Sequence, residues 1–186
     1  MTRITTLVIA LIIVLCPPTW AQDDDSLPPG KFGVSVGVRQ GFGQLGDDFG
    51  PGAVGAIEAG FHPAAFDQRL SIGLHWSVAW GWFGFVDNQA SVTGSLKLLE
   101  LHFGTRIRRM LGDPQRFLWL GTGVTLLRSN VPIPPDLERD YIGPHVSLGA
   151  EQFLAGSFIV SFEARYGLIV GGPRSISLAL GIAFGH

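Results

Sequence analysis

The chain has little cysteine, little lysine and no long apolar run after its first twenty residues. A single cysteine, Cys16, excludes a disulfide framework and a cysteine-rich metal site, because both need several cysteines. Lysine occurs only at Lys31 and Lys97, and charged residues make up 15% of the chain. Soluble domains usually carry about 25%. We therefore expect part of the surface to face something other than water.

The missing apolar run excludes membrane-spanning helices after residue 20, because such a helix needs about 18 or more consecutive apolar residues. Any membrane-spanning element there would have to be a strand. The net charge is −2, and no basic block or stripe occurs, so nucleic acid is not expected as a partner. A chain of 186 residues suits one substantial domain.

Residues 1–21 have the pattern of a secretory signal peptide. Arg3 supplies a positive charge, an apolar stretch follows, and Thr19, Trp20 and Ala21 form a plausible cleavage site. Residues 22–30 are acidic and then proline-rich, which predicts a solvated lead-in. Residues 31–186 are predicted to form the single domain. They contain no cysteine, and we expect no cofactor.

From residue 32 onward, large apolar residues alternate with small ones, a period of two that is typical of β-strands. Eight strands are predicted, at residues 32–39, 53–61, 70–85, 92–108, 116–127, 141–153, 158–168 and 176–184. At about ten residues or more, each is expected to be long enough to cross a bilayer when tilted. The fifth is ambiguous, because placing Leu118 and Leu120 on the apolar face sends Phe117 and Trp119 to the polar face. Its facing stays open.

Apolar and polar residues alternate along the strands of both a soluble sandwich and a membrane barrel, so the residue types on each face must decide between the two folds. Glycine, alanine and serine dominate the polar faces, which suits the crowded interior of an eight-stranded barrel. All ten aspartates fall in the leader junction, predicted loops or predicted turns, whereas four of the five glutamates lie mid-strand on the small-residue face. Facing lipid would be costly for these glutamates, so we expect them to point inward toward arginine or histidine partners.

The predicted lumen polar network comprises Arg39, Glu58, His75, Glu100, His102, Arg106, His145, Glu151, Glu163 and Arg165. The aromatic residues on the apolar faces predict a girdle at the membrane interface, formed by Trp76, Trp80, Trp82 and Tyr166. The pattern thus favours a barrel with a charged interior and an apolar exterior.

With this leader, strand number, alternation and an aliphatic and aromatic C-terminal strand, residues 31–184 resemble the small outer-membrane barrels of Gram-negative bacteria, the OmpA/OmpX type. The resemblance implies an all-β fold, an eight-stranded antiparallel up-and-down transmembrane β-barrel in the cell outer membrane. It also implies a monomer that contacts membrane lipid and lipopolysaccharide and is inserted by the outer-membrane assembly machinery.

The function expected from this reading is a structural or surface-interaction role through extracellular loops, without enzymatic activity. With a periplasmic N-terminus, the outward loops are predicted at residues 41–52, 86–91, 128–140 and 171–174. A narrow ion or solute pore is the alternative, and it differs only in whether a continuous water path crosses the lumen. Residues 41–52 and 128–140 are long enough to recognise a partner.

Two groups of side chains could carry chemistry. A symmetric hairpin would place His75 opposite His102, and two adjacent histidines could bind a metal. No third ligand is securely placed beside them, so we interpret both as polar filler of the interior and predict no metal site.

The second group consists of His145, Ser147 and Glu163. If these residues were catalytic, the protein would be a lipid A-modifying, deacylase-like enzyme, which is the second alternative function. A tight turn at residues 155–156 would bring Glu163 near Ser147 and Arg165 near His145. The His-x-Ser spacing is weakly similar to that of the outer-membrane lipid A deacylases, whose working residues face lipid. Here the same residues are predicted to face the lumen, which favours an internal charge network over catalysis.

Overall fold

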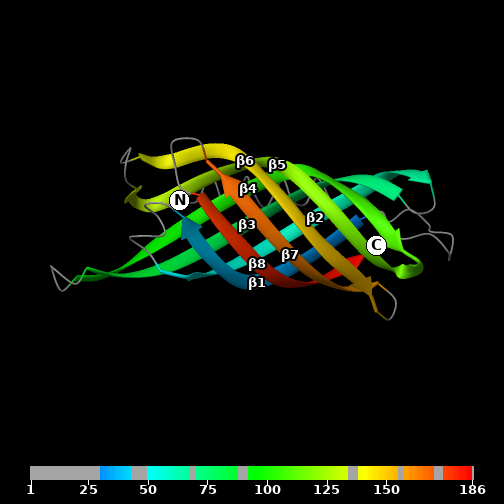
Figure 1. Cartoon of the computed structure of the whole chain (residues 1–186), viewed down its shortest axis with the longest axis horizontal. Coiled ribbons are helices and arrows are strands. Elements are labelled where there is room, and N and C mark those ends of the chain that lie inside the picture. The colour runs from blue at the N-terminus through cyan, green and yellow to red at the C-terminus, as the bar shows by residue number, and fades with distance from the viewer. Residues whose placement is uncertain are drawn as a thin grey trace.

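The protein folds into a closed barrel of eight antiparallel strands (Figure 1). The computed structural model describes residues 30–42, 50–67, 70–87, 92–133, 138–154, 157–169 and 174–185. Residues 1–29, and with them the predicted signal peptide, lie outside these ranges. The strands are β1 (Gly30–Phe42), β2 (Gly52–Asp67), β3 (Leu70–Asp87), β4 (Val92–Leu111), β5 (Asp113–Ile133), β6 (Glu138–Phe153), β7 (Phe158–Leu168) and β8 (Arg174–Gly185).

Each strand pairs with its neighbours in sequence, and β1 pairs with β8 along its whole length to close the sheet. The all-β, up-and-down barrel predicted from the sequence is therefore confirmed. No helix long and apolar enough to cross a membrane occurs among the described residues. Because the sheet is closed, it has no edge strand whose backbone N–H and C=O groups would lack partners.

The barrel has two different ends. Residues 43–51, 88–91, 134–137 and 169–173 connect strands at one end, which we call the loop end. Residues 68–69, 112 and 154–157 connect strands at the other end, the turn end, where β1 begins and β8 finishes. The even number of strands places both ends of the sheet on the same side.

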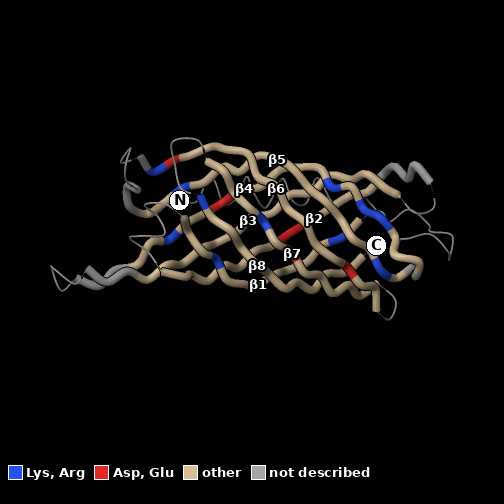
Figure 2. The backbone as a smooth tube through the Cα atoms, in the orientation of Figure 1, with Lys and Arg blue, Asp and Glu red and all other residues tan. Residues whose placement is uncertain are grey.

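The faces are the reverse of those in a soluble protein. Val36 and Leu180 point outward and are 69% and 62% exposed, and the outward residues around them are also large and apolar. The four predicted girdle residues share these outward faces. Charged residues are sparse along the middle of the strands (Figure 2), and seven charged side chains are buried in the lumen. The exterior is therefore an apolar belt.

The structure settles the facing of the fifth strand. Phe117 and Trp119 are 3% and 4% exposed and face the lumen, whereas Leu118 and Leu120 face outward. In the lumen the two aromatic rings contact cations: Arg108 lies over the Phe117 ring and Arg106 over the Trp119 ring. Both faces of this strand are bulky, so residue size alone could not distinguish them.

Several strands are longer than predicted, and the predicted loop at residues 128–140 is wrong. Arg128 pairs with Asp140, and after a register shift Ile133 pairs with Glu138, so only residues 134–137 separate β5 from β6. Proline suggested a loop there, but a strand tolerates proline at an edge or a bulge. Likewise β2 continues to Asp67 through two register shifts.

Two glycines occupy positions that a larger residue could not easily take. Gly112, the single residue between β4 and β5, has a φ of 73°, in the left-handed region that favours glycine. At Gly123 a Cβ atom would clash with the carbonyl oxygen of Phe103 on the adjacent strand. Strands of this narrow barrel approach each other too closely for a side chain at that position.

Candidate functional site

The centre of the lumen is a cation surrounded by carboxylates from three strands. Arg106, on β4, is 2% exposed, and its Nη2 lies 2.7 Å from Oε2 of Glu163 and 3.8 Å from Oε2 of Glu58. Its Nη1 lies 3.8 Å from Oε1 of Glu151, and its guanidinium carbon lies 3.7 Å from the centre of the Trp119 ring. Convergence of β2, β6 and β7 on one arginine balances charges that would otherwise be costly to bury.

Further cations extend this inner group in both directions. The Nε of Arg165 donates to Oε1 of Glu163 at 2.7 Å, and its Nη1 donates to the Ser77 hydroxyl at 3.4 Å. Toward the turn end, Lys31 pairs with Glu151.

Nη1 of Arg108 lies 3.5 Å from Oε2 of the same Glu151 carboxylate. The predicted network omitted Lys31 and Arg108. Both share the parity of small residues on their own strands, Gly33 for Lys31 and Gly104 for Arg108, and that signal could have found them.

A second, outer group lies nearer the loop end. Arg39 binds Glu100 through both terminal nitrogens, with Nη2 2.7 Å from Oε2. Nε2 of His102 lies 3.0 Å from the same carboxylate, and its Nδ1 lies 2.8 Å from the Thr125 hydroxyl. That hydroxyl lies 3.0 Å from Nδ1 of His145. One charge pair thus anchors a short chain of hydrogen-bonding side chains.

The predicted pairing of His75 with His102 is wrong. His75 lies opposite Gly104, and His102 lies opposite Ser77, because β3 and β4 pair continuously up to Asp87 and Val92. The hairpin therefore turns one residue later than a loop at residues 86–91 would allow. The histidine beside His102 is instead His145, whose ring lies edge-on with its centre 5.3 Å away.

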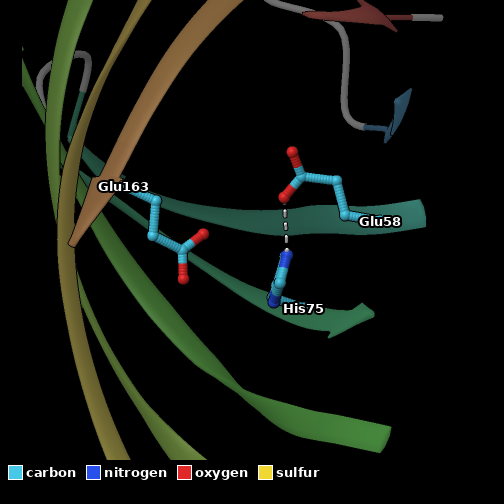
Figure 3. A group of neighbouring side chains, drawn as sticks. All are labelled: Glu58, His75 and Glu163. Atoms are coloured by element: carbon cyan, nitrogen blue, oxygen red, sulfur yellow. Dashed lines mark hydrogen bonds and ion pairs between the residues drawn. The ribbon is translucent and has the colours of Figure 1, made fainter. Parts of the chain in front are cut away.

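His75 belongs to a cluster with Glu58 and Glu163 (Figure 3). Its Nε2 lies 3.2 Å from Oε2 of Glu58, and one ligand atom from each of the three residues lies within 4.8 Å of the others. A metal could use such ligands, but Glu163 already binds two guanidinium groups, those of Arg106 and Arg165. The arrangement is better explained as ion pairs and hydrogen bonds.

The predicted contacts of Ser147 are also wrong. Ser147 lies opposite Arg165, His145 lies opposite Gly167, and Glu163 lies opposite Gly149. The pairing ends at Phe153 with Ile159, so the connection is longer than the tight turn assumed. Both His145 and Ser147 are buried in the lumen.

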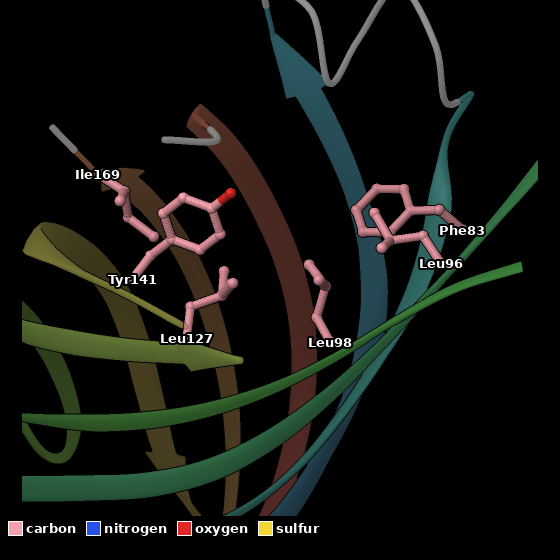
Figure 4. Packing of buried hydrophobic residues seen from close by; sticks show 6 residues of the cluster. All are labelled: Phe83, Leu96, Leu98, Leu127, Tyr141 and Ile169. Atoms are coloured by element: carbon pink, nitrogen blue, oxygen red, sulfur yellow. The ribbon is translucent and has the colours of Figure 1, made fainter. Parts of the chain in front are cut away.

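Apolar clusters lie at both ends of the polar lumen. At the loop end, Phe83 and Leu96 lie together on one side, Leu127, Tyr141 and Ile169 lie on the other, and Leu98 lies between (Figure 4). At the turn end, a second cluster contains Phe117, Phe153, Ile159 and Ala183, with Met110 packed against it. The charged groups are thus flanked by apolar packing along the barrel axis.

No protein-family model and no curated protein sequence matches the chain. Solved structures do. Neisserial surface protein A aligns with a TM-score of 0.62 and 15% identity over 87% of this chain and 100% of that one. The attachment invasion locus protein Ail of Yersinia pestis aligns with a TM-score of 0.54 and 15% identity over 83% and 97% of the two chains. The outer membrane enzyme PagL gives a TM-score of 0.54 and 12% identity over 84% and 99%.

These structural similarities identify the fold of the chain. The fold is that of the small eight-stranded outer-membrane barrels. At such identities they show the fold alone, because one barrel architecture serves proteins of different function.

Proposed function

We propose that this protein is an outer-membrane barrel that holds surface-exposed loops, with a structural or surface-interaction role and neither enzymatic activity nor conductance. One observation carries the proposal. The lumen is filled by an ion-pair network flanked by apolar clusters, while the large apolar side chains point outward. A barrel of this kind is closed inside and needs lipid outside.

Membrane lipid and lipopolysaccharide are the partners that this exterior suits. The outward face of β4, β5 and β6 has an apolar hollow of about 520 Å³, lined by Leu99, Leu101, Leu126 and Ile142 among others. At its rim, Nε of Arg128 lies 3.5 Å from Oδ1 of Asp140. An acyl chain would fill such a hollow and place a polar headgroup beside this exposed ion pair.

The surface role rests on the loop end. The similar structures include a protein described as a surface protein and one described as an attachment invasion locus protein, which has also been crystallised with a heparin analogue. Attachment by loops on a closed barrel is consistent with a lumen occupied by ion pairs and apolar clusters. The assembly machinery of the outer membrane would insert the chain as a monomer.

The enzyme alternative has less support. PagL shows that an enzyme can share this architecture, but His145 and Ser147 are buried in the lumen, away from the lipid that a lipid A-modifying enzyme must reach. The described hydrogen bonds of the His145 side chain go to Thr125, and Glu163 binds Arg106 and Arg165. We therefore propose that these residues fill the interior.

Cysteine labelling on intact cells tests the location and orientation. Cys16, the sole cysteine, lies in the predicted signal peptide, so the unmodified protein is the unlabelled control. A membrane-impermeant maleimide should label Asp47→Cys, between β1 and β2, in intact cells. It should label Ala155→Cys, at the turn end, only after permeabilisation. Recovery of the chain in the soluble periplasm, or equal labelling of both variants, would contradict the proposal.

Conductance separates this role from a pore. In planar bilayers the purified barrel should leave the current at the level of the empty membrane, because charged side chains and apolar clusters occupy the lumen. A porin reconstituted in the same way provides the positive control. Discrete, reproducible current steps from this protein would favour the pore instead.

A further inference from the structure

The charged side chains that the structure describes in the lumen do not balance. Among the described residues, five cations face it, Lys31, Arg39, Arg106, Arg108 and Arg165, against four carboxylates, Glu58, Glu100, Glu151 and Glu163. The outer group is neutral, because Arg39 matches Glu100, so the excess positive charge belongs to the inner group. Protonation of any lumen histidine would only increase it. An unbalanced charge inside a protein is costly.

Two small cavities lie where the inner and outer groups meet. Each has a volume of about 20 Å³, enough for one water molecule or a small ion, and both are lined by Arg39, Arg165 and Ser177. Glu100 borders the first cavity and Glu163 the second. Each of these carboxylates is already bound by its own arginine.

The arginines beside the cavities have donors to spare. Arg39 uses both terminal nitrogens on Glu100, and its buried Nε has no hydrogen-bond partner among the described residues. For Nη1 of Arg165, the described bond is a long one, to Ser77 at 3.4 Å. The Ser177 hydroxyl adds a further potential donor. One orphaned donor and one weakly bound donor in a buried, polar site indicate an acceptor between them.

From the excess charge, the two cavities and the unused donors, we propose that the lumen binds one monovalent anion of the size of chloride between Arg39 and Arg165. The anion neutralises the inner group and accepts the spare N–H and O–H groups. It acts as a structural counter-ion that connects the two charge groups across the barrel. A divalent cation at the Glu58, His75 and Glu163 cluster would instead enlarge the imbalance.

Halide dependence of unfolding is the first test. For the whole barrel in detergent, the thermal transition should lie higher in sodium chloride or bromide than in sodium gluconate at equal ionic strength. It should also rise with halide concentration, because an ion that binds only the folded state stabilises it. Crystals grown in bromide should show an anomalous peak between Arg39 and Arg165. Identical transitions in all three salts, with no peak, would overturn the proposal.

Two substitutions of equal size provide the second test. Ser177→Asp supplies a covalent negative charge beside the cavities, and Ser177→Asn supplies the same shape without charge. In gluconate we expect the aspartate variant to unfold at a higher temperature than the asparagine variant, and to have lost its response to halide. If water alone occupies the cavities, the buried aspartate will be the less stable of the two, and the proposal fails.

Discussion

Glu163→Gln is expected to lower the free energy of unfolding by about 3–5 kcal/mol, the usual effect of removing one partner from a buried ion pair. Glu163 is bound by Nη2 of Arg106 at 2.7 Å and by Nη2 of Arg165 at 2.6 Å. Glutamine keeps the shape but leaves both guanidinium groups without their nearest negative charge. Urea unfolding of the barrel in detergent micelles or vesicles, followed by tryptophan fluorescence, measures the change.

Two further variants make this result specific. Asp140→Asn removes one partner of the exposed pair with Arg128, whose side chains are 69% and 62% exposed, and should change stability by less than about 1 kcal/mol. Combining Glu163→Gln with Arg165→Gln removes one of the two stranded cations and should recover part of the loss. Equal effects of the two single substitutions would contradict a stabilising role for the lumen network.

Leu180→Arg is expected to destabilise the barrel in phospholipid vesicles by about 2–4 kcal/mol, the range found for a cation near the bilayer midplane. Leu180 faces outward and pairs with Val36 and Phe162, and all three lie near the middle of their strands. A guanidinium there must either lose its water or distort the bilayer. Reversible unfolding from vesicles measures the change.

The control for this prediction is an arginine at a different depth in the membrane. Leu111→Arg places the same cation on the outward face beside Gly112, at the turn end, where about 0–1 kcal/mol is expected near the membrane interface. Leu180→Ala measures lost packing without charge. A soluble barrel would show no dependence on depth and would tolerate arginine at the exposed Leu180, so equal and small effects would reject the membrane assignment.

The lumen residues show which parts of the interior could be predicted from the sequence. Alternation placed Glu58, Glu100, Glu151 and Glu163 on the small-residue face, and the structure has all four in the lumen. It missed Lys31, which lies just at the start of β1, and left Phe117 and Trp119 undecided because both faces of their strand are bulky. In the structure Arg106 and Arg108, on the neighbouring strand β4, lie over these two rings, and the residue pattern of a single strand does not show contacts between strands.

Partners across strands were less predictable than faces. His75 with His102 and Ser147 with Glu163 were both expected from assumed turn lengths, and both true registers differ from the assumed ones by two residues. A shift of two residues leaves every side chain on its own face, because the strand period is two, but it gives each residue a new neighbour.

By itself, then, the sequence determined the all-β class, the eight strands and, outside the fifth strand, most of the side chains that face inward, since each follows from a period of two and from residue polarity. Only the tertiary structure decided the register, the extent of the strands beyond residues 127 and 61, and the pairing of Arg106 with Glu163 and of Arg39 with Glu100. The physical reason is that these pairings depend on hairpin lengths and barrel closure, which bring together side chains 57 and 61 residues apart in the chain.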